Sequence, residues 1–128
     1  MRRTILLTTT FMFVAGCSRT DVPKERYFNG ETVEHWLAAM KSPDPKTRKK
    51  AADVLGNVGP VDPGAIPALM LAVKDPDPKV RDAAVLGLSK IGPAARDAAP
   101  VLEDATKDKD PAVRSHAVVA LERVRASP

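Results

Sequence analysis

Aromatic residues and cysteines are scarce in this chain of 128 residues. Only 4% of its residues are Phe, Trp or Tyr, and Cys17 is its single cysteine. An intramolecular disulfide is therefore excluded, so stability has to come from packing. Because hydrophobic residues still make up 44% of the sequence, the apolar content rests largely on Ala, Val and Leu, which suits helices packed closely through small side chains.

The sequence also lacks a strong excess of charge and the motifs of common catalytic sites. Without Arg2 and Arg3, which belong to the leader described below, 18 basic and 16 acidic side chains remain, a balance that gives no basic footprint for nucleic acid. No nucleophile elbow or phosphate-binding glycine loop occurs. The two histidines, His35 and His116, have no partner at metal-ligand spacing. We therefore predict no metal, no cofactor and no catalytic residue.

Residues 1–16 have the parts of a secretory signal peptide: two arginines, an apolar stretch at residues 5–15, and small residues before Cys17. The apolar stretch is about half as long as a transmembrane helix requires, so a permanent span is not expected. The tetrad Val-Ala-Gly-Cys at residues 14–17 resembles the bacterial lipobox, in which lipid is joined to the cysteine sulfur and the leader is cut just before it.

The lipobox resemblance implies an exported bacterial lipoprotein that is anchored to a membrane through Cys17. Ser18 follows this cysteine, which by the sorting rule of such proteins favours the outer membrane. The alternative is an ordinary secretory leader with a chance cysteine.

Residues 17–31 are mostly polar and are interpreted as the lipidated N-terminus and a tether. Tyr27 and Phe28 are the exceptions. We expect these two aromatic residues to fold over the open side of the first helix near Trp36; the alternative is that they remain mobile on the tether.

The remaining residues, 32–128, repeat themselves with a period of 33 residues. The segments that begin at residues 42, 75 and 108 align without a gap, which divides this part into units of about 32–65, 66–98 and 99–128. The recurring residues are Asp44, Asp77 and Asp110; Pro45, Pro78 and Pro111; Arg48, Arg81 and Arg114; Ala51, Ala84 and Ala117; and Leu55, Leu88 and Leu121. So many coincidences at one spacing indicate a repeat architecture.

Each unit contains two helical stretches separated by an Asp-Pro turn. First helices are expected at about 33–41, 66–74 and 99–107, and second helices follow the turns. The turn aspartates are predicted to be N-caps, with proline at the first helical position. Asp75 and Asp108, two residues before such caps, resemble calcium-loop fragments without the remaining ligands and are also interpreted as capping residues. Because one helix pair cannot bury its apolar face alone, the units should stack into a short all-α solenoid of three hairpins.

The run Asp-Pro-Lys-Val-Arg-x-x-Ala-x-x-x-Leu-x-x-Ile-Gly-Pro at residues 77–93 resembles HEAT repeats, specifically the short bacterial type also found in phycobilisome lyases. In that family the turn aspartate and the helix arginine help to lock neighbouring repeats. The matching residues here are Asp44, Asp77 and Asp110 with Arg48, Arg81 and Arg114. An arginine fork can satisfy carbonyls or a carboxylate at the next turn while its stem lies on apolar surface.

The resemblance also implies that the second helices line the concave side of the solenoid. The outward-facing positions there form a predicted binding stripe, which consists of Lys49, Asp82 and Ser115, then Asp53, Leu86 and Val119, then Asn57, Lys90 and Arg123. Charged residues around two exposed aliphatic ones are compatible with a protein or peptide partner, and the alternative is a solvated face without one.

These observations favour a membrane-anchored protein-protein interaction module, a scaffold or accessory subunit, on the envelope side of a bacterium. The alternative, from another class, is an enzyme or enzyme subunit that resembles the HEAT-like chromophore lyases. Those lyases act in the cytoplasm and consist of longer solenoids, and both facts count against this alternative. Nucleic-acid binding is disfavoured by the leader and by the nearly balanced charge.

Overall fold

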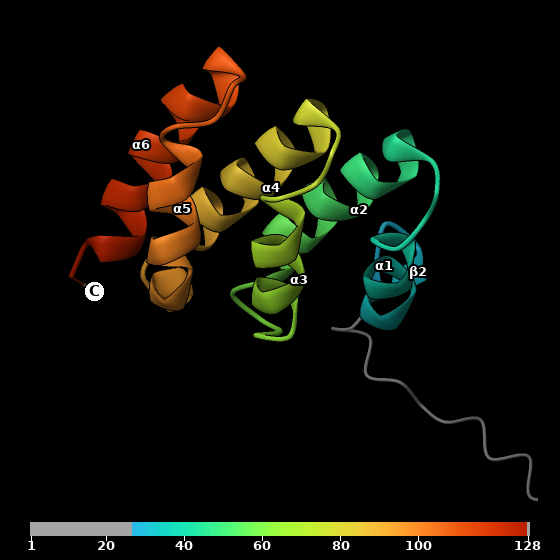
Figure 1. Cartoon of the computed structure of the whole chain (residues 1–128). Coiled ribbons are helices and arrows are strands. Elements are labelled where there is room, and N and C mark those ends of the chain that lie inside the picture. The colour runs from blue at the N-terminus through green and yellow to red at the C-terminus, as the bar shows by residue number, and fades with distance from the viewer. Residues whose placement is uncertain (1–26, 128) are drawn as a thin grey trace, which may run out of the picture.

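The computed structural model describes residues 27–127, and the predicted leader, Cys17 and most of the predicted tether lie outside this range. The described elements follow in the order β1 (Tyr27–Phe28), β2 (Glu31–Thr32), α1 (Val33–Ala39), α2 (Pro45–Val58), α3 (Ala65–Ala72), α4 (Pro78–Ile91), the 3-10 helix η2 (Gly92–Ala98), α5 (Ala99–Ala105) and α6 (Pro111–Arg125). The prediction of an all-α solenoid is confirmed (Figure 1).

The helices form two rows. The first helices of the hairpins, α1, α3 and α5, make one row, and the longer second helices, α2, α4 and α6, make the other (Figure 1). Within the second row α2 packs against α4, and α4 packs against α6. The core runs between the rows, where Leu55 of α2, Leu69 of α3, Leu88 of α4 and Leu102 of α5 are fully buried. The middle helix α4 is therefore covered on both sides.

The three second helices begin where the Asp-Pro turns predicted them. Asp77 accepts hydrogen bonds from the backbone N–H groups of Lys79 and Val80 at 2.8 and 3.3 Å. Asp44 and Asp110 cap α2 and α6 in the same way, and a proline follows each cap. The carboxylates thus satisfy backbone donors that have no partner inside the helix, which fixes the start of each second helix.

The N-terminal end of the solenoid is covered by a small β-hairpin. Its strands pair Tyr27 with Thr32 and Phe28 with Glu31, through a turn in which Asn29 and Gly30 both have positive φ, as tight hairpin turns require. The backbone carbonyl of Phe28 accepts a 2.9 Å hydrogen bond from Trp36 Nε1, and the Phe28 side chain packs against the core.

The hairpin differs from the sequence prediction in two respects. First, residues 27–28 and 31 of the predicted tether lie in strands. These strands are too short to show a period in the sequence, and the hydrogen bond from Trp36 to Phe28 holds them in place. The side chain of Phe28 covers the end of the solenoid as expected, whereas Tyr27 is 47% exposed and does not.

The second helices approach one another closely because small residues lie between them. A Cβ atom built on Gly56 of α2 would lie 2.6 Å from the Cα atom of Gly87 in α4. One repeat later the same two positions carry Ser89 and Ala120, which are also buried. Because these side chains are small, the backbones of neighbouring second helices can pack almost in contact.

Substitution of Gly56 tests this contact. Gly→Ala in an exposed helix interior normally stabilises a protein by about 1 kcal/mol. We expect the reverse for Gly56→Ala, a loss of about 1–3 kcal/mol, because the added methyl group pushes α2 and α4 apart. Thermal unfolding followed by circular dichroism measures the effect, with Ser115→Ala on the exposed side of α6 as the control. A Gly56→Ala variant as stable as the wild type contradicts the proposed backbone contact.

Candidate functional site

Arg81 of α4 joins the second and third hairpins. Its Nε and Nη2 atoms donate to the two carboxylate oxygens of Asp108, at 2.8 and 3.0 Å. Its Nη1 atom donates to the backbone carbonyls of Asp75 and Pro76 at 3.0 and 3.1 Å. The side chain is 7% exposed. One guanidinium therefore holds the turn of its own hairpin and the carboxylate of the next.

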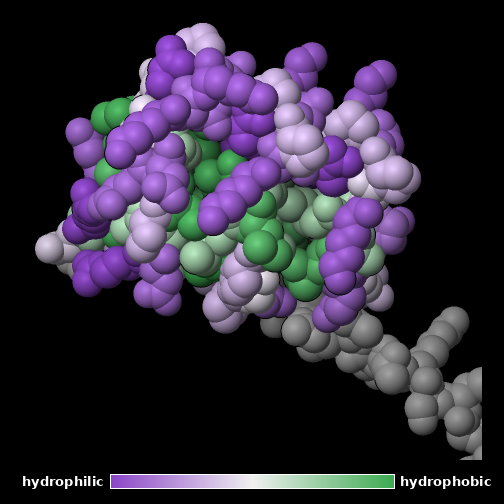
Figure 2. Space-filling view, in the orientation of Figure 1, coloured by the Kyte–Doolittle hydropathy of each residue, from purple (hydrophilic) through white to green (hydrophobic). Residues whose placement is uncertain are grey.

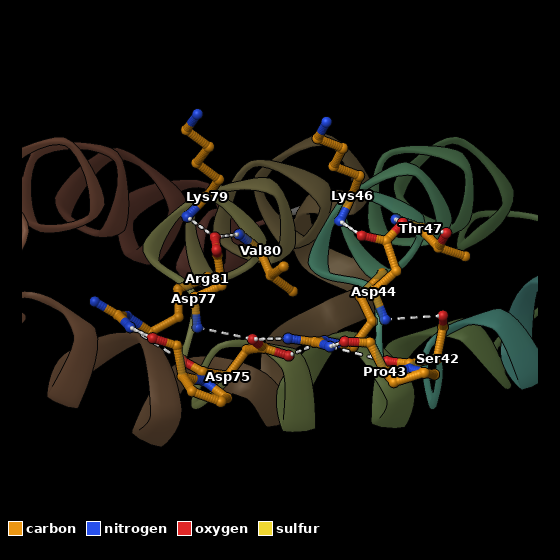
Figure 3. Close-up of polar contacts among 12 residues, drawn as sticks. Ser42, Pro43, Asp44, Lys46, Thr47, Asp75, Asp77, Lys79, Val80 and Arg81 are labelled. Carbon is orange, nitrogen blue, oxygen red and sulfur yellow. Dashed lines mark hydrogen bonds and ion pairs between the residues drawn. The ribbon is translucent and has the colours of Figure 1, made fainter.

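Arg48 of α2 repeats this geometry one hairpin earlier. It donates to the carboxylate of Asp75 at 2.8 and 3.0 Å, and its Nη1 atom donates to the carbonyls of Ser42 and Pro43. Figure 3 shows Asp75 between the turns of the first and second hairpins. We call Arg48, Arg81 and Arg114 the arginine ladder.

The aspartates of this ladder differ from those that the sequence predicted. The caps Asp44, Asp77 and Asp110 hold the starts of their own helices, and the ladder arginines do not donate to them. The acceptors are instead Asp75 and Asp108, for which the sequence pattern predicts only a capping role. Each also accepts from the backbone N–H two residues later, at 2.9 and 2.8 Å. The sequence did contain a signal for these two acceptors, because Ser42, Asp75 and Asp108 recur at 33 residues. Ser42 accepts the equivalent backbone hydrogen bond in the first hairpin.

The ionisation of the two acceptors is shifted toward the charged form. Burial acts to raise the pKa of Asp75, but the hydrogen bonds from Arg48 and from the Asp77 backbone N–H, together with the nearby positive charge, outweigh it and hold the pKa below its ordinary value. The same balance, with Arg81 as the donor, lowers the pKa of Asp108. Both carboxylates are therefore charged when the hairpins are docked.

The predicted stripe lies on the surface of the second helices. Of its nine residues Asp53 and Asp82 are half-buried and the other seven are exposed. The aliphatic members Leu86 and Val119 are 37% and 45% exposed. Both are in register on adjacent helices, so the stripe presents apolar side chains among charged ones. We call these nine residues the second-helix stripe.

Polar contacts connect the stripe from one helix to the next. Lys90 Nζ donates to the side-chain oxygen of Asn57 at 3.4 Å, which links α4 to α2. His116 Nδ1 lies 2.6 Å from a carboxylate oxygen of Asp82, which links α6 to α4. His116 was not predicted as part of this surface, although it is next to Ser115 in sequence. The stripe is consequently continuous across the three second helices.

The row of first helices carries apolar surface that sequence reasoning missed. Leu71 of α3 is 77% exposed. It lies between a groove of about 170 Å³ shared with α1 and a groove of about 490 Å³ shared with α5, lined by Met40 and Leu37 on one side and Met70 and Val101 on the other. Figure 2 shows hydrophobic side chains at the surface of this face. The uniformly apolar sequence of α3 gave no indication of which side is exposed.

Comparison with known protein families agrees with this architecture. The family model of HEAT repeats matches residues 33–122, from the start of α1 into α6 of the third hairpin. The chain belongs to the HEAT-repeat family. HEAT repeats generally serve as protein-interaction scaffolds rather than catalysts. A search of curated proteins found no match.

Two further features of the HEAT-repeat chain concern chemistry and membranes. Across residues 27–127 no group of three or more His, Cys, Asp or Glu side chains is arranged to hold a metal ion. In the same part of the chain no helix is long and apolar enough to span a bilayer.

Removal of each ladder arginine gives a graded prediction. Arg81→Ala leaves the Asp108 carboxylate without its partner in a mostly buried position, so we expect it to cost about 2–4 kcal/mol of unfolding free energy. Arg114→Ala should cost less than about 1 kcal/mol, because this arginine is exposed and holds no carboxylate within the described residues. Urea unfolding of the two variants measures the difference. Equal losses would contradict the ladder.

The acid sensitivity of the fold gives a second prediction. The folded-state pKa values of Asp75 and Asp108 lie below the unfolded value of about 4, so their contribution is complete above about pH 5 and is lost as the pH falls through the folded values. We expect the wild-type Tm to fall steadily below about pH 5. The double variant Asp75→Asn and Asp108→Asn should begin at a lower Tm and lose less of it. An unchanged pH dependence in the double variant contradicts this assignment.

Proposed function

We propose that this protein is an exported, lipid-anchored interaction module on the envelope side of a bacterium, which binds a protein partner and catalyses no reaction. The second-helix stripe carries the proposal. It is one continuous surface in which Leu86 and Val119 are exposed among charged side chains, and contacts of Lys90 with Asn57 and of Asp82 with His116 join its three helices. Exposed apolar side chains rimmed by charge are typical of protein contact sites.

The proposed anchor supports the same function. If Cys17 is the acylated N-terminus, nine residues separate it from β1, which limits the reach of the tether to about 30 Å. The repeats would then stay close to the membrane. Confinement of this kind raises the effective concentration of any partner anchored in the same membrane, so that a moderate contact along the stripe is sufficient.

Charge substitutions in the stripe test the binding surface. We expect Leu86→Asp and Val119→Asp each to reduce partner recovery about tenfold or more, since a buried carboxylate would replace an apolar contact. Crosslinking and affinity capture from membranes, with quantitative mass spectrometry, measures recovery. Val61→Asp is the matched control, because Val61 is 64% exposed outside the stripe. Identical partners at identical yield in all four proteins would remove the stripe from consideration.

The anchor is tested separately at Cys17. We expect the mature protein to begin at Cys17 with an acylated N-terminus, as seen by intact-mass spectrometry, and Cys17→Ser to leave the membrane fraction. Three acyl chains bind a membrane almost irreversibly, since each buried methylene contributes about 0.8 kcal/mol, whereas no helix of the described residues could span it. A free, unmodified Cys17 in a membrane-bound wild-type protein would contradict lipidation.

A further inference from the structure

The last arginine of the ladder is positioned like the others but lacks their acceptor. Arg114 Nη1 donates to the carbonyls of Asp108 and Lys109 at 2.8 and 3.1 Å, just as Arg81 Nη1 holds its own turn. In Arg81 the Nε and Nη2 atoms grip the carboxylate of Asp108. In Arg114 these two atoms donate to no acceptor within residues 27–127. The fork is therefore already oriented to receive a carboxylate.

Apolar positions beside this fork are also open. Ala52 and Val85 are fully buried in the first two hairpins, whereas their counterpart Val118 in α6 is 49% exposed. Likewise Leu55 and Leu88 are fully buried, whereas Leu121 is half-buried. In the first two units another second helix packs against this one, whereas within residues 27–127 none packs beyond α6. Arg114, Val118 and Leu121 thus form what we call the end face.

The opposite end of the solenoid is closed. Phe28 packs against the core there, and its backbone carbonyl accepts from Trp36. The ladder acceptor is also missing at that end, since Ser42 takes the place of an aspartate, and Asp75 and Asp108 are already bound by arginines of this chain. A second copy stacked head to tail would place Ser42, and not a carboxylate, at the ladder position that faces Arg114.

The end face is also unsuited to packing of a further hairpin in the way that the three hairpins pack on one another. Glu122 occupies the position of Gly56 and Ser89, which are buried and small where neighbouring second helices meet. A large charged side chain at this point prevents another second helix from approaching as closely as α4 approaches α2. We therefore expect a ligand of this face to contact the Arg114 fork and the apolar positions through one helix of its own, and not through a complete helical hairpin.

From these contacts we propose that the end face binds a helix of another protein that carries a carboxylate in the turn after its C-terminus, as α5 carries Asp108. The carboxylate is held by Nε and Nη2 of Arg114, and apolar side chains of the helix cover Val118 and Leu121. This surface differs from the second-helix stripe, so the protein holds a second binding partner or a second part of the same one.

A photocrosslinker at Val118 tests the proposal in the full-length protein. A photoreactive phenylalanine analogue is placed there in the cells that make the protein, and the adduct is identified by mass spectrometry. The expected adduct joins Val118 to a helical segment of another protein with Asp or Glu in its following turn. Its yield should fall about tenfold or more with Arg114→Ala and stay unchanged with Arg125→Ala, an exposed arginine on the same helix that pairs with Glu103 and belongs to neither surface.

Other outcomes overturn the proposal. They are an adduct with a second copy only, an adduct with lipid only, no adduct, and an adduct whose yield does not depend on Arg114. Thermal unfolding checks that each variant is folded. Leu86→Asp is included so that the two surfaces are separated: loss of stripe binding with an unchanged Val118 adduct supports the end face independently of the proposed function.

Discussion

Each helical hairpin of this protein buries its apolar side chains between its own two helices and against the neighbouring hairpins. The contact that makes this work is the close approach of the second helices, where Gly56 faces Gly87 and the backbones nearly touch. Small side chains at the contact leave room for the fully buried leucines between the two rows of helices. The arginine ladder then fixes the register, because Arg48 and Arg81 each bind the turn of their own hairpin and the carboxylate of the next.

This arrangement makes the two ends of the solenoid unequal. The first hairpin is closed by a β-turn and the hydrogen bond between Trp36 and Phe28, while the third leaves Arg114 and Val118 accessible. Ser42 lies in the first hairpin at the position where the later hairpins have the acceptor aspartate. Without a carboxylate there, a second copy of the chain cannot extend the arginine ladder. One end therefore serves stability, and the other is available for recognition.

The start of each second helix and the stacking of the hairpins into a solenoid could be predicted from the sequence, whereas the partners and exposure of particular side chains could not. The Asp-Pro turns predict the starts of the second helices, because the capping carboxylate and the proline both favour a helix within three residues of the turn. The partner of Arg48 could not be read in the same way, because Asp75 lies 27 residues away and its role depends on how the hairpins stack. The exposure of Leu71 was hidden for a related reason, since α3 is apolar on every side.

Native-state hydrogen exchange tests most directly whether the hairpins hold one another in place. If neighbours supply the stability, amides of the middle helix α4, which is covered by α2 and by α6, should exchange most slowly, and those of α1 and α6 should exchange faster. Exchange in α6 as slow as in α4 would contradict this account, because it would mean that a hairpin with one neighbour is as stable as a hairpin with two.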